Sequence, residues 1–286
     1  MTETTQRVLV AVVGIPLAIG VVFLGGWVLA GLLVTIAVLA ALEFYRIAGR
    51  KEAHPMPALG AGLAAAFIVL AALHPERGPE GFGVMLTVGT LLVATFAIWA
   101  RGVEGQPLLS ISTTLAGAVY TGVLLSFGLF LRHLPGNQNA SHGTALVFAP
   151  LLLTWTSDTF AYFVGRQWGR HKLIPRVSPG KTVEGAVGAV VGSVLVGLAY
   201  SALANSFATY RMTWLEGAIL GLLVSVVAQV GDLAESLLKR DGGVKDSGAL
   251  LPGHGGALDR FDSLLFTLPL AYFFLRYWVG PISVSG

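Results

Sequence analysis

The sequence has no cysteine and few charged residues for its length of 286. Without cysteine, disulfide bonds, thiolate metal ligands and thiol nucleophiles are all excluded. Charged residues form 12% of the chain, against about 25% in soluble domains. That share is too small to cover the surface of a water-soluble protein when 55% of the residues are hydrophobic and the mean hydropathy is +0.76. We therefore expect lipid to surround much of the chain.

Signals of several other protein classes are also missing. The 18 basic and 15 acidic residues are too nearly balanced to indicate a nucleic-acid partner. The sequence has no repeat of fixed period, no low-complexity segment and no matched pair of broken hydrophobic segments. The last of these marks many transporters, so its absence argues against a transporter.

Long apolar runs dominate what is present. A helix needs about 20 mostly apolar residues to cross a bilayer core of about 30 Å. Runs of this kind lie at residues 8–25, 27–45, 56–74, 82–100, 108–131, 143–165, 183–204, 213–235 and 262–280. The first lacks a convincing small-residue cleavage site, so we interpret it as a retained helix. The sequence predicts an all-α, polytopic integral membrane protein with about nine transmembrane helices.

The basic residues predict how these helices are oriented. With nine spans and a cytoplasmic N-terminus, most of the 18 Lys and Arg residues fall on one face. The other face or its helix ends receive only Arg77, Arg132, Arg211 and Arg276. Because basic loops are retained in the cytoplasm, the first face is predicted to be cytoplasmic and the C-terminus to lie on the opposite side.

Polar residues divide the chain into two regions. Residues 1–140 carry few polar groups at helix ends, whereas the later stretches 154–182 and 231–263 are rich in them. We therefore predict a transmembrane scaffold over residues 1–140 and a transmembrane catalytic region over residues 141–286, with its site at the cytoplasmic face. In the scaffold, Glu43 is interpreted as an interfacial charge. Three glycines are interpreted as packing positions between helices, namely Gly185, Gly188 and Gly192.

Carboxylates gather near two helix ends within residues 231–263. Polar side chains three or four residues apart share a helix face before and after a Gly-rich basic loop. Carboxylate oxygens suit a hard cation such as Mg²⁺, held jointly with substrate phosphates. Because an acid near bilayer depth costs about 2.5–3.5 kcal/mol on insertion scales, a functional role is favoured over ordinary flanking charges. The side chains of this stretch are Asp232, Glu235 and Ser236 before the loop, Asp246 in it, and Asp259 and Asp262 after it. The cost argument concerns Asp232, Asp259 and Asp262.

The same stretch supplies positive charge and a histidine. Lys239, Arg240, Lys245 and Arg260 can bind substrate phosphates. Lys239 and Arg240 can equally be anchors whose charged ends extend to the membrane surface. His254 lies in the sequence Pro-Gly-His-Gly-Gly, where it either contacts a ligand or caps a tight turn.

A second polar stretch covers residues 157–185. Asp158 and Tyr162 share one face near the end of the sixth predicted helix, and a basic loop follows. The loop ends in Ser178–Thr182, which leads into the seventh helix. Backbone N–H groups at a helix N-terminus bind anions, and Lys181 lies beside them. The orientation rule alone is an alternative explanation for the basic residues of this loop.

These residues favour phosphoryl or nucleotidyl transfer over acyl transfer. Such reactions need mainly positioning and charge neutralisation, and the sequence offers no nucleophile–base pair. A nucleotide would reach the cytoplasmic loops, and a lipid phosphate would enter from the leaflet. A phosphate monoester is largely a dianion near pH 7, so it needs no general base to act as a nucleophile. The triplet Gly180-Lys181-Thr182 is not a Walker A motif, because Pro175 stands where that motif needs glycine.

The C-terminal polar stretch follows a specific pattern. It reads Ser236-x-Leu238-Lys239-Arg240-(x4)-Lys245-Asp246-x-Gly248-(x2)-Leu251-Pro252-x-His254-Gly255-Gly256-(x2)-Asp259-Arg260-Phe261-Asp262. This pattern resembles that of the phosphatidate cytidylyltransferase (CDP-diacylglycerol synthase) family. Residues 157–185 are similar to the second motif of that family, and the N-terminal half agrees in hydrophobic character only. Ala257 and Val183 depart from the family's usual larger aliphatic and aromatic residues, which leaves the polar positions intact.

The resemblance implies that CTP and phosphatidate react to give CDP-diacylglycerol and pyrophosphate, with one Mg²⁺ ion or two. It also implies a polytopic inner-membrane enzyme, surrounded by membrane lipids, that forms a homodimer. Among the residues of this chain, it makes Asp232, Asp246, Asp259 and Asp262 candidate metal ligands. Ser236, Lys239, Arg240, Lys245, His254 and Arg260 become candidate phosphate or nucleotide contacts. Asp158, Ser178, Lys181 and Thr182 would complete the site.

Three other classes of protein are alternatives to this family. A polyprenol or phytol kinase is similar in using CTP at a membrane, but it transfers the γ-phosphate to an alcohol and needs a base to activate the hydroxyl. A CDP-alcohol phosphatidyltransferase carries an Asp-Gly-x2-Ala-Arg run, which this chain lacks. A transporter places charges at the bilayer midplane, whereas the acids here gather at one face.

Overall fold

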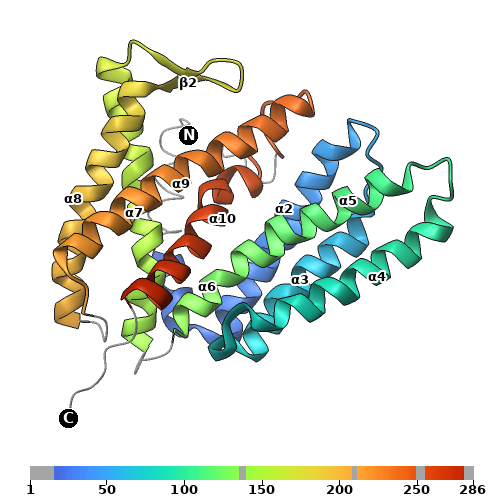
Figure 1. Cartoon of the computed structure of the whole chain (residues 1–286), viewed down its shortest axis with the longest axis horizontal. Coiled ribbons are helices and arrows are strands. Elements are labelled where there is room, and N and C mark those ends of the chain that lie inside the picture. The colour runs from blue at the N-terminus through green and yellow to red at the C-terminus, as the bar shows by residue number, and fades with distance from the viewer. Residues whose placement is uncertain (1–15, 135–139, 208–210, 249–254, 280–286) are drawn as a thin grey trace. The chain divides into compact units, whose positions relative to one another are not determined.

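The computed structural model describes residues 16–134, 140–207, 211–248 and 255–279, which are almost entirely helical (Figure 1). Residues 16–24 form a helix that ends at Gly25. The helices that follow are α2 (Gly26–Gly49), α3 (Pro57–Leu73), α4 (Phe82–Ala100), α5 (Pro107–Ala118), α6 (Leu124–Arg132), α7 (Ala140–Trp168), α8 (Val183–Phe207), α9 (Trp214–Asp241) and α10 (Leu258–Phe273). A 3₁₀ turn, η1 (Pro75–Gly81), joins α3 to α4. Two π-helical turns, η2 (Val119–Val123) and η3 (Phe274–Val279), follow α5 and α10. The predicted all-α class is confirmed.

Six helical segments within the described residues are long and apolar enough to cross a membrane. They are Gly26–Gly49, Pro75–Ala100, Pro107–Arg132, Ala140–Trp168, Val183–Asn205 and Trp214–Asp241, and α3 is a shorter apolar helix. Large apolar side chains on several of these helices are exposed, among them Leu91, Trp99 and Leu195. Exposed apolar surface of this extent is what lipid contact requires. The protein is a multi-pass membrane protein, and the number of nine spans stays a prediction.

Two helices extend further into the polar stretch than hydropathy alone predicts. α9 continues to Asp241, and α10 begins at Leu258 instead of at residue 262. Lys239 and Arg240 lie in the last turn of α9, where basic side chains complement the helix dipole. Asp259 lies in the first turn of α10, where an acidic side chain does the same. The polar residues thus support helix ends that an apolar pattern cannot reveal.

The chain forms two compact units, and their boundaries differ from the predicted division at residue 140. The first unit consists of residues 1–130 and 238–261, and the second consists of residues 131–237 and 262–286. Residues 238–248 and 255–261, which the sequence grouped with the second half, therefore pack with the N-terminal helices. The roles of scaffold and catalytic region stay predictions.

In the first unit, α2, α3, α4 and α5 pack along one another (Figure 1). Tyr45 on α2 is buried and donates a hydrogen bond of 2.7 Å to the carbonyl oxygen of Thr114 on α5. Arg101 Nε donates to the carbonyl oxygen of His54 and to Ser110 Oγ, each at 3.1 Å. The two Arg101 bonds connect the end of α4 to the segment between α2 and α3 and to the first turn of α5. An apolar cluster lies between the same helices, formed by Met56, Leu63, Val93, Ala97 and Ala118.

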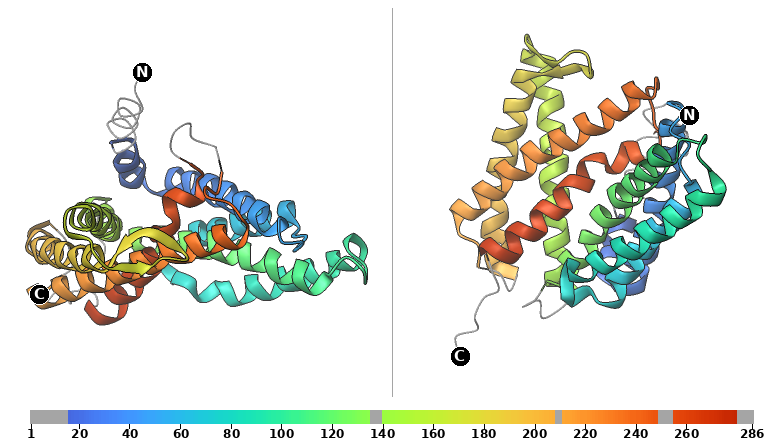
Figure 2. Two further views of the ribbon diagram at one scale, coloured as in Figure 1. Left: turned by 90° about the horizontal axis from the view of Figure 1, so that it is seen from above. Right: turned by 45° about the vertical axis from the view of Figure 1, so that its right-hand side comes forward.

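In the second unit, α7 and α8 lie side by side over much of their length (Figures 1 and 2). Gly185 allows this approach, because a Cβ atom there would come within 2.8 Å of the Ala161 carbonyl oxygen. Gly188 and Gly192 likewise face α7 side chains, so the predicted packing role of all three glycines is confirmed. Buried hydroxyl pairs add to the packing: Ser157 Oγ and Ser225 Oγ are 2.9 Å apart, and Thr154 donates to Thr267 at 3.1 Å.

The segment between α7 and α8 is a β-hairpin and not the loop that the sequence suggested. Strands β1 (Lys172–Ile174) and β2 (Ser178–Thr182) pair antiparallel, with Lys172 opposite Thr182 and Ile174 opposite Ser178. The two strands are short and flanked by basic residues and proline. They therefore lack the alternation of apolar and polar residues by which a strand is recognised in a sequence. The hairpin extends from the paired ends of α7 and α8 (Figure 2).

Candidate active site

A cavity of about 490 Å³ lies in the second unit where α7, the hairpin, α8 and α9 meet. Its volume is in the range of about 300–1,000 Å³ that is usual for small-molecule sites. α7 contributes Asp158, Ala161, Tyr162, Gly165 and Arg166; the hairpin contributes Leu173, Gly180, Lys181 and Thr182; α8 and α9 contribute Gly185, Ala186, Gln229 and Asp232. Asp158 and Tyr162 both line the cavity, which confirms that they share a face of α7.

An ion pair joins the hairpin to α9 inside this cavity. Lys181 Nζ lies 2.8 Å from Asp232 Oδ2, and both side chains are partly exposed. Ser236, one turn further along α9, donates to Asp232 Oδ1 at 3.3 Å. The sequence placed Asp232 and Ser236 on one helix face, and the structure confirms this. It also brings Lys181 to that face, although helix α8 separates Lys181 from α9 in the sequence.

The cavity contains more than one charge of each sign. Asp158 on α7 and Asp232 on α9 both line it, and Asp158 is exposed. Arg166 donates a hydrogen bond of 2.8 Å to the Tyr162 hydroxyl, which places its guanidinium at the same wall. Gln229, on α9, donates to the Ser225 carbonyl oxygen at 3.2 Å. A cavity that combines two carboxylates with an ammonium and a guanidinium group can bind an anion and a cation together.

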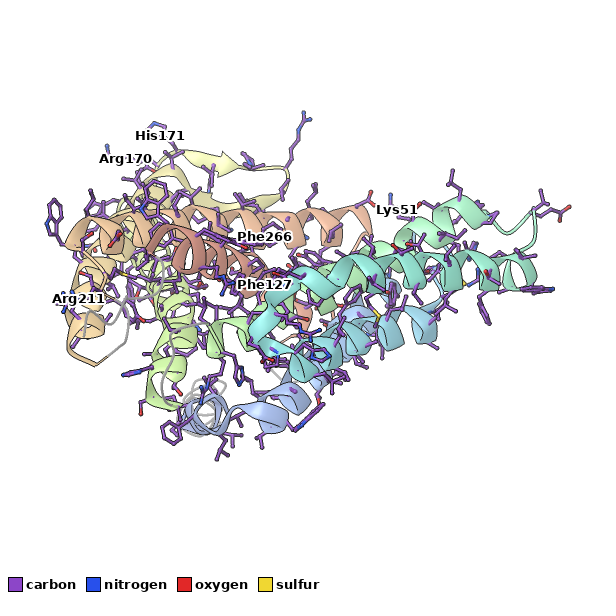
Figure 3. The ribbon with its side chains drawn as sticks, turned by 60° about the horizontal axis from the view of Figure 1, so that its bottom comes forward. Lys51, Phe127, Arg170, His171, Arg211 and Phe266 are labelled. Carbon is purple, nitrogen blue, oxygen red and sulfur yellow. The ribbon has the colours of Figure 1, made fainter. Side chains whose placement is uncertain are left out.

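The strand leading into α8 is fixed by its own side chains. Thr182 is buried, and its hydroxyl accepts the Gly185 N–H at 3.1 Å, as an N-cap residue does. Glu184 accepts the backbone N–H groups of Arg170 and His171 at 3.1 and 3.2 Å and contacts the His171 ring at 2.6 Å. Figure 3 shows Arg170 and His171 side by side near the start of the hairpin. These contacts hold the hairpin, and therefore Lys181, against α8.

A second group of polar residues is buried in the first unit. Lys239 Nζ lies 2.7 Å from Asp259 Oδ1, and the two side chains are only 14% and 12% exposed. Asp259 Oδ2 accepts the backbone N–H groups of Ser247 and Gly256, each at 2.9 Å, and it lies 2.9 Å from the Ser247 hydroxyl. We call Glu43, Lys239, Ser247 and Asp259 the Glu43 cluster, because Glu43 also contacts Ser247, at 2.8 Å.

Glu43 is the functional candidate that the sequence did not identify. It is 4% exposed, and the interpretation as an interfacial charge is wrong. An acidic residue inside an otherwise apolar run of α2 was the only available signal, and it could not show which partner the carboxylate binds. Gln229 and Glu184 were missed as well, because neither was recognised as part of a group of polar residues spaced three or four positions apart on a helix.

The remaining predicted site residues lie outside these two groups. Asp262, in the second unit, accepts the backbone N–H of Ser263 at 2.6 Å. Arg240 donates to the Val244 carbonyl oxygen at 3.4 Å, and Lys245, Asp246 and Arg260 are exposed. Ser178 is half-buried in β2, opposite Ile174. His254 lies outside the described residues.

The four predicted metal ligands are divided between the two compact units. Asp232 and Asp262 belong to the second unit, and Asp246 and Asp259 belong to the first. In the part of the chain that the structure describes, no three His, Asp or Glu residues are arranged to hold a metal ion. Mg²⁺, however, is commonly bound through one or two carboxylates together with substrate phosphates and water. Asp158 and Asp232, which share the cavity, fit that requirement.

Comparison with known proteins identifies the family. The profile of the cytidylyltransferase family matches residues 5–278. A phosphatidate cytidylyltransferase of Synechocystis sp. is 35% identical over 95% of this chain and 96% of its own length. One from Staphylococcus epidermidis is 34% identical over 92% of this chain and 96% of its own length. One from Brucella abortus is 40% identical over 71% of this chain and 70% of its own length. The chain therefore belongs to the cytidylyltransferase family and is a membrane-embedded nucleotidyltransferase.

Proposed function

We propose that this protein is a phosphatidate cytidylyltransferase, which converts CTP and phosphatidate into CDP-diacylglycerol and pyrophosphate in phospholipid biosynthesis. Relatives aligned over nearly their whole length carry this name. The observation that carries the proposal in this chain is the Lys181–Asp232 pair in a cavity that Asp158 also lines. A nucleotidyl transfer needs such a combination, because it must hold several phosphates and a cation in one place.

Lys181 is assigned to the triphosphate of CTP. Its ammonium group lies in the cavity at the end of β2, next to the N-terminus of α8. An incoming triphosphate competes with Asp232 for this ammonium, and charge-assisted hydrogen bonds to phosphate are strong. Arg166 at the neighbouring wall supplies a second positive charge. These groups hold the triphosphate while negative charge develops on the leaving pyrophosphate.

Asp158 and Asp232 would hold Mg²⁺ if the ion binds in this cavity. When bound, Mg²⁺ supplies charge neutralisation to the phosphate oxygens. The two carboxylates keep a cation near phosphates that they would otherwise repel. Asp246, Asp259 and Asp262 stay candidate ligands, although Asp259 already has both oxygens within 3 Å of hydrogen-bond donors.

The reaction itself needs no proton transfer. An oxygen of the phosphatidate phosphate attacks the α-phosphorus of CTP, and a P–O bond forms there. The bond from the α-phosphorus to its bridging oxygen breaks, and pyrophosphate leaves with the electron pair. Because the attacking monoester is largely a dianion at neutral pH, this chain has to supply orientation and positive charge and no general base.

Product analysis tests the proposal against its nearest rival. Purified protein in detergent is given phosphatidate, Mg²⁺ and CTP labelled at either the α- or the γ-phosphate. We expect α-label in a lipid product and γ-label in pyrophosphate in equal amounts. Transfer of γ-label to a polyprenol or phytol, without α-label in lipid, would identify a CTP-dependent kinase. Absence of both products from folded protein would contradict the proposed function.

We also propose that the site faces the cytoplasm, in the inner membrane of the cell, and that the protein forms a homodimer. The asymmetry of the basic residues supports the orientation, because basic loops remain in the cytoplasm. The dimer rests on the resemblance alone. A reporter fused after Gly286 should give a periplasmic signal if nine spans are present, and a cytoplasmic signal would contradict that count. Light scattering in detergent, with the detergent mass subtracted, would show whether one chain or two are present.

A further inference from the structure

Glu43 is a carboxylate in an unfavourable place. It lies on α2, one of the helices able to cross a membrane, and its side chain is 4% exposed. A charged side chain at bilayer depth costs about 2.5–3.5 kcal/mol on insertion scales unless partners compensate it. A buried carboxylate is therefore retained where its hydrogen bonds serve the structure or the function.

Within the described part of the chain, the hydrogen-bond partners of the Glu43 side chain come from the C-terminal motif, more than 200 positions later. Glu43 Oε2 accepts hydrogen bonds from the Ser247 hydroxyl and the Leu258 N–H, each at 2.8 Å. Glu43 Oε1 accepts the Ala257 N–H at 3.0 Å. All of these residues belong to the first unit. A single side chain of α2 thus binds both sides of the motif segment that separates α9 from α10.

Two of these donors belong to the N-terminus of α10. Ala257 precedes that helix and Leu258 is its first residue. N–H groups at this position have no acceptor within the helix and commonly bind a carboxylate or phosphate. Here Glu43 is that anion. The N-terminus of α10 is consequently used for internal anchoring, unlike the N-terminus of α8, which lies at the cavity beside Lys181.

The Ser247 hydroxyl connects Glu43 to the Lys239–Asp259 pair. Its oxygen lies 2.8 Å from Glu43 Oε2 and 2.9 Å from Asp259 Oδ2. A hydroxyl has one proton to donate, so the two carboxylates share it. Asp259 in turn holds Lys239 Nζ at 2.7 Å. The position of this lysine therefore depends, through three hydrogen bonds, on where the Glu43 carboxylate lies.

Two glycines of the motif are required by the same carboxylate. A Cβ atom at Gly248 would overlap Glu43 Oε1, and one at Gly256 would overlap Glu43 Oε2 and the Ser247 hydroxyl. Only a residue without a side chain permits the backbone to approach Glu43 so closely. The glycine pattern of the C-terminal motif is thus partly a consequence of a residue in the N-terminal half.

We propose that Glu43 is a positioning residue for the reaction. It anchors residues 247–248 and 256–258 and thereby fixes Asp259 and Lys239, which the resemblance assigns to metal or phosphate binding. It does so without contacting substrate itself. This inference rests on the proposed function, since Lys239 and Asp259 matter to turnover only if the protein transfers a nucleotidyl group. It gives the N-terminal half a part in catalysis beyond that of a scaffold.

The test compares four proteins in detergent: wild type, Glu43→Gln, Glu43→Asp and Tyr45→Phe. Gln has the shape of Glu, but its NH₂ group must face an N–H or O–H donor, so the motif loses at least one anchor. Tyr45→Phe is the matched control, because Tyr45 is buried two residues away on α2 and loses only its bond to the Thr114 carbonyl. For each protein, kcat and KM for CDP-diacylglycerol formation are measured together with the thermal unfolding midpoint.

We expect Glu43→Gln to lower kcat at least about tenfold, since small displacements of catalytic groups have effects of this size or larger. Glu43→Asp should recover part of the loss because it keeps the charge, and Tyr45→Phe should keep the wild-type kcat. The inference is overturned if Glu43→Gln keeps the wild-type kcat, or if Tyr45→Phe loses as much activity as Glu43→Gln. A wild-type protein that makes no CDP-diacylglycerol would instead refute the proposed function.

A second variant decides the matter if Glu43→Gln does not fold. Ser247→Ala removes only the hydroxyl that Glu43 and Asp259 share. The inference expects a lower kcat for Ser247→Ala with an unfolding midpoint close to that of Tyr45→Phe. A wild-type kcat in Ser247→Ala would show that the connection from Glu43 to Asp259 does not affect the reaction.

Discussion

Asp232 in the cavity and Asp259 in the Glu43 cluster each form an ion pair with a lysine, at 2.8 and 2.7 Å, but their surroundings differ. The side chains of Lys181 and Asp232 are 24% and 36% exposed, whereas those of Lys239 and Asp259 are 14% and 12% exposed. Asp259 also accepts two backbone N–H groups, each at 2.9 Å, whereas the hydrogen bond from Ser236 to Asp232 is long, at 3.3 Å. Lys181 and Asp232 can therefore exchange partners with a ligand. Asp259, by contrast, is held in place by backbone N–H groups.

This difference teaches that spacing alone does not separate a ligand-binding carboxylate from an anchoring one. Both aspartates lie near a helix end, and the family resemblance makes both of them candidate metal ligands. What distinguishes them is the number of donors already bound and the access from a cavity. The comparison predicts that changes in the cavity act on substrates and leave stability nearly intact, whereas changes in the Glu43 cluster act on both.

The largest effect is expected for Asp232→Asn. Loss of this charge removes a candidate Mg²⁺ ligand and the partner of Lys181, and we expect kcat to fall about 100-fold or more, as for other groups that stabilise developing charge. The unfolding midpoint should change little, because a partly exposed ion pair contributes about 1 kcal/mol or less. Transfer of α-label from CTP to lipid measures the first quantity, and thermal unfolding in detergent measures the second.

The matched control is Asp241→Asn, on the same helix. Asp241 pairs with Lys51 at 3.5 Å, and both side chains are largely exposed, so turnover should stay at the wild-type level. Equal activity loss in both variants would show that Asp232 has no special place in the site.

A smaller effect, confined to one substrate, is expected for Lys181→Ala. A hydrogen bond to a charged group contributes about 1.5–3 kcal/mol, so KM for CTP should rise roughly 10- to 100-fold. KM for phosphatidate should change far less if Lys181 binds the triphosphate. Lys172→Ala is the control, because Lys172 is an exposed residue of the same hairpin. An unchanged KM for CTP would indicate that Lys181 does not bind the triphosphate and is a basic residue at the membrane surface.

For Asp259→Asn the comparison predicts a combined loss. The new amide group must face the N–H donors of Ser247 and Gly256, and unsatisfied buried polar groups cost about 1–3 kcal/mol each. We therefore expect a lower unfolding midpoint than for Asp232→Asn, together with about a tenfold loss of kcat from displaced groups. If Asp259→Asn has the unfolding midpoint of the wild type, Asp259 does not anchor the structure and the proposed difference between the two aspartates is wrong.

The smallest effect is expected for Glu184→Gln. Glu184 anchors the backbone of Arg170 and His171, so its replacement should loosen the hairpin that carries Lys181. A loss of about 1 kcal/mol corresponds to roughly a fivefold rise in KM for CTP. Steady-state kinetics at varied CTP measures it. A rise in KM for phosphatidate alone would show that the hairpin serves the lipid substrate instead.

The positions of the helices could be predicted because apolar runs of membrane length leave little choice of structure. It could also be predicted that Asp232 and Ser236 share a helix face, and that Asp158 and Tyr162 do, because helix periodicity determines this. The extension of α9 to Asp241 and the β-hairpin were missed, because both are set by polar residues whose partners lie elsewhere in the fold.

Contacts over long sequence distances could not be predicted. The bond from Ser247 to Glu43 connects residues 204 positions apart, and the local sequence around Glu43 resembles any helix end near a membrane surface. The pairing of Lys181 with Asp232 was implied only in so far as both motifs resemble one family. The family resemblance implied that the four aspartates are metal ligands, and a sequence pattern does not show which compact unit each one joins.

We expect the nucleotide to bind in the cavity of the second unit. Photoaffinity labelling with an azido-cytidine triphosphate, followed by peptide mapping of the wild-type protein in detergent, tests it most directly. We expect unlabelled CTP to suppress the label and the labelled peptides to come from residues 158–166, 173–186 or 229–236. Labelling that CTP suppresses but that lies on α2 or at residues 255–261, with none on these peptides, would contradict it.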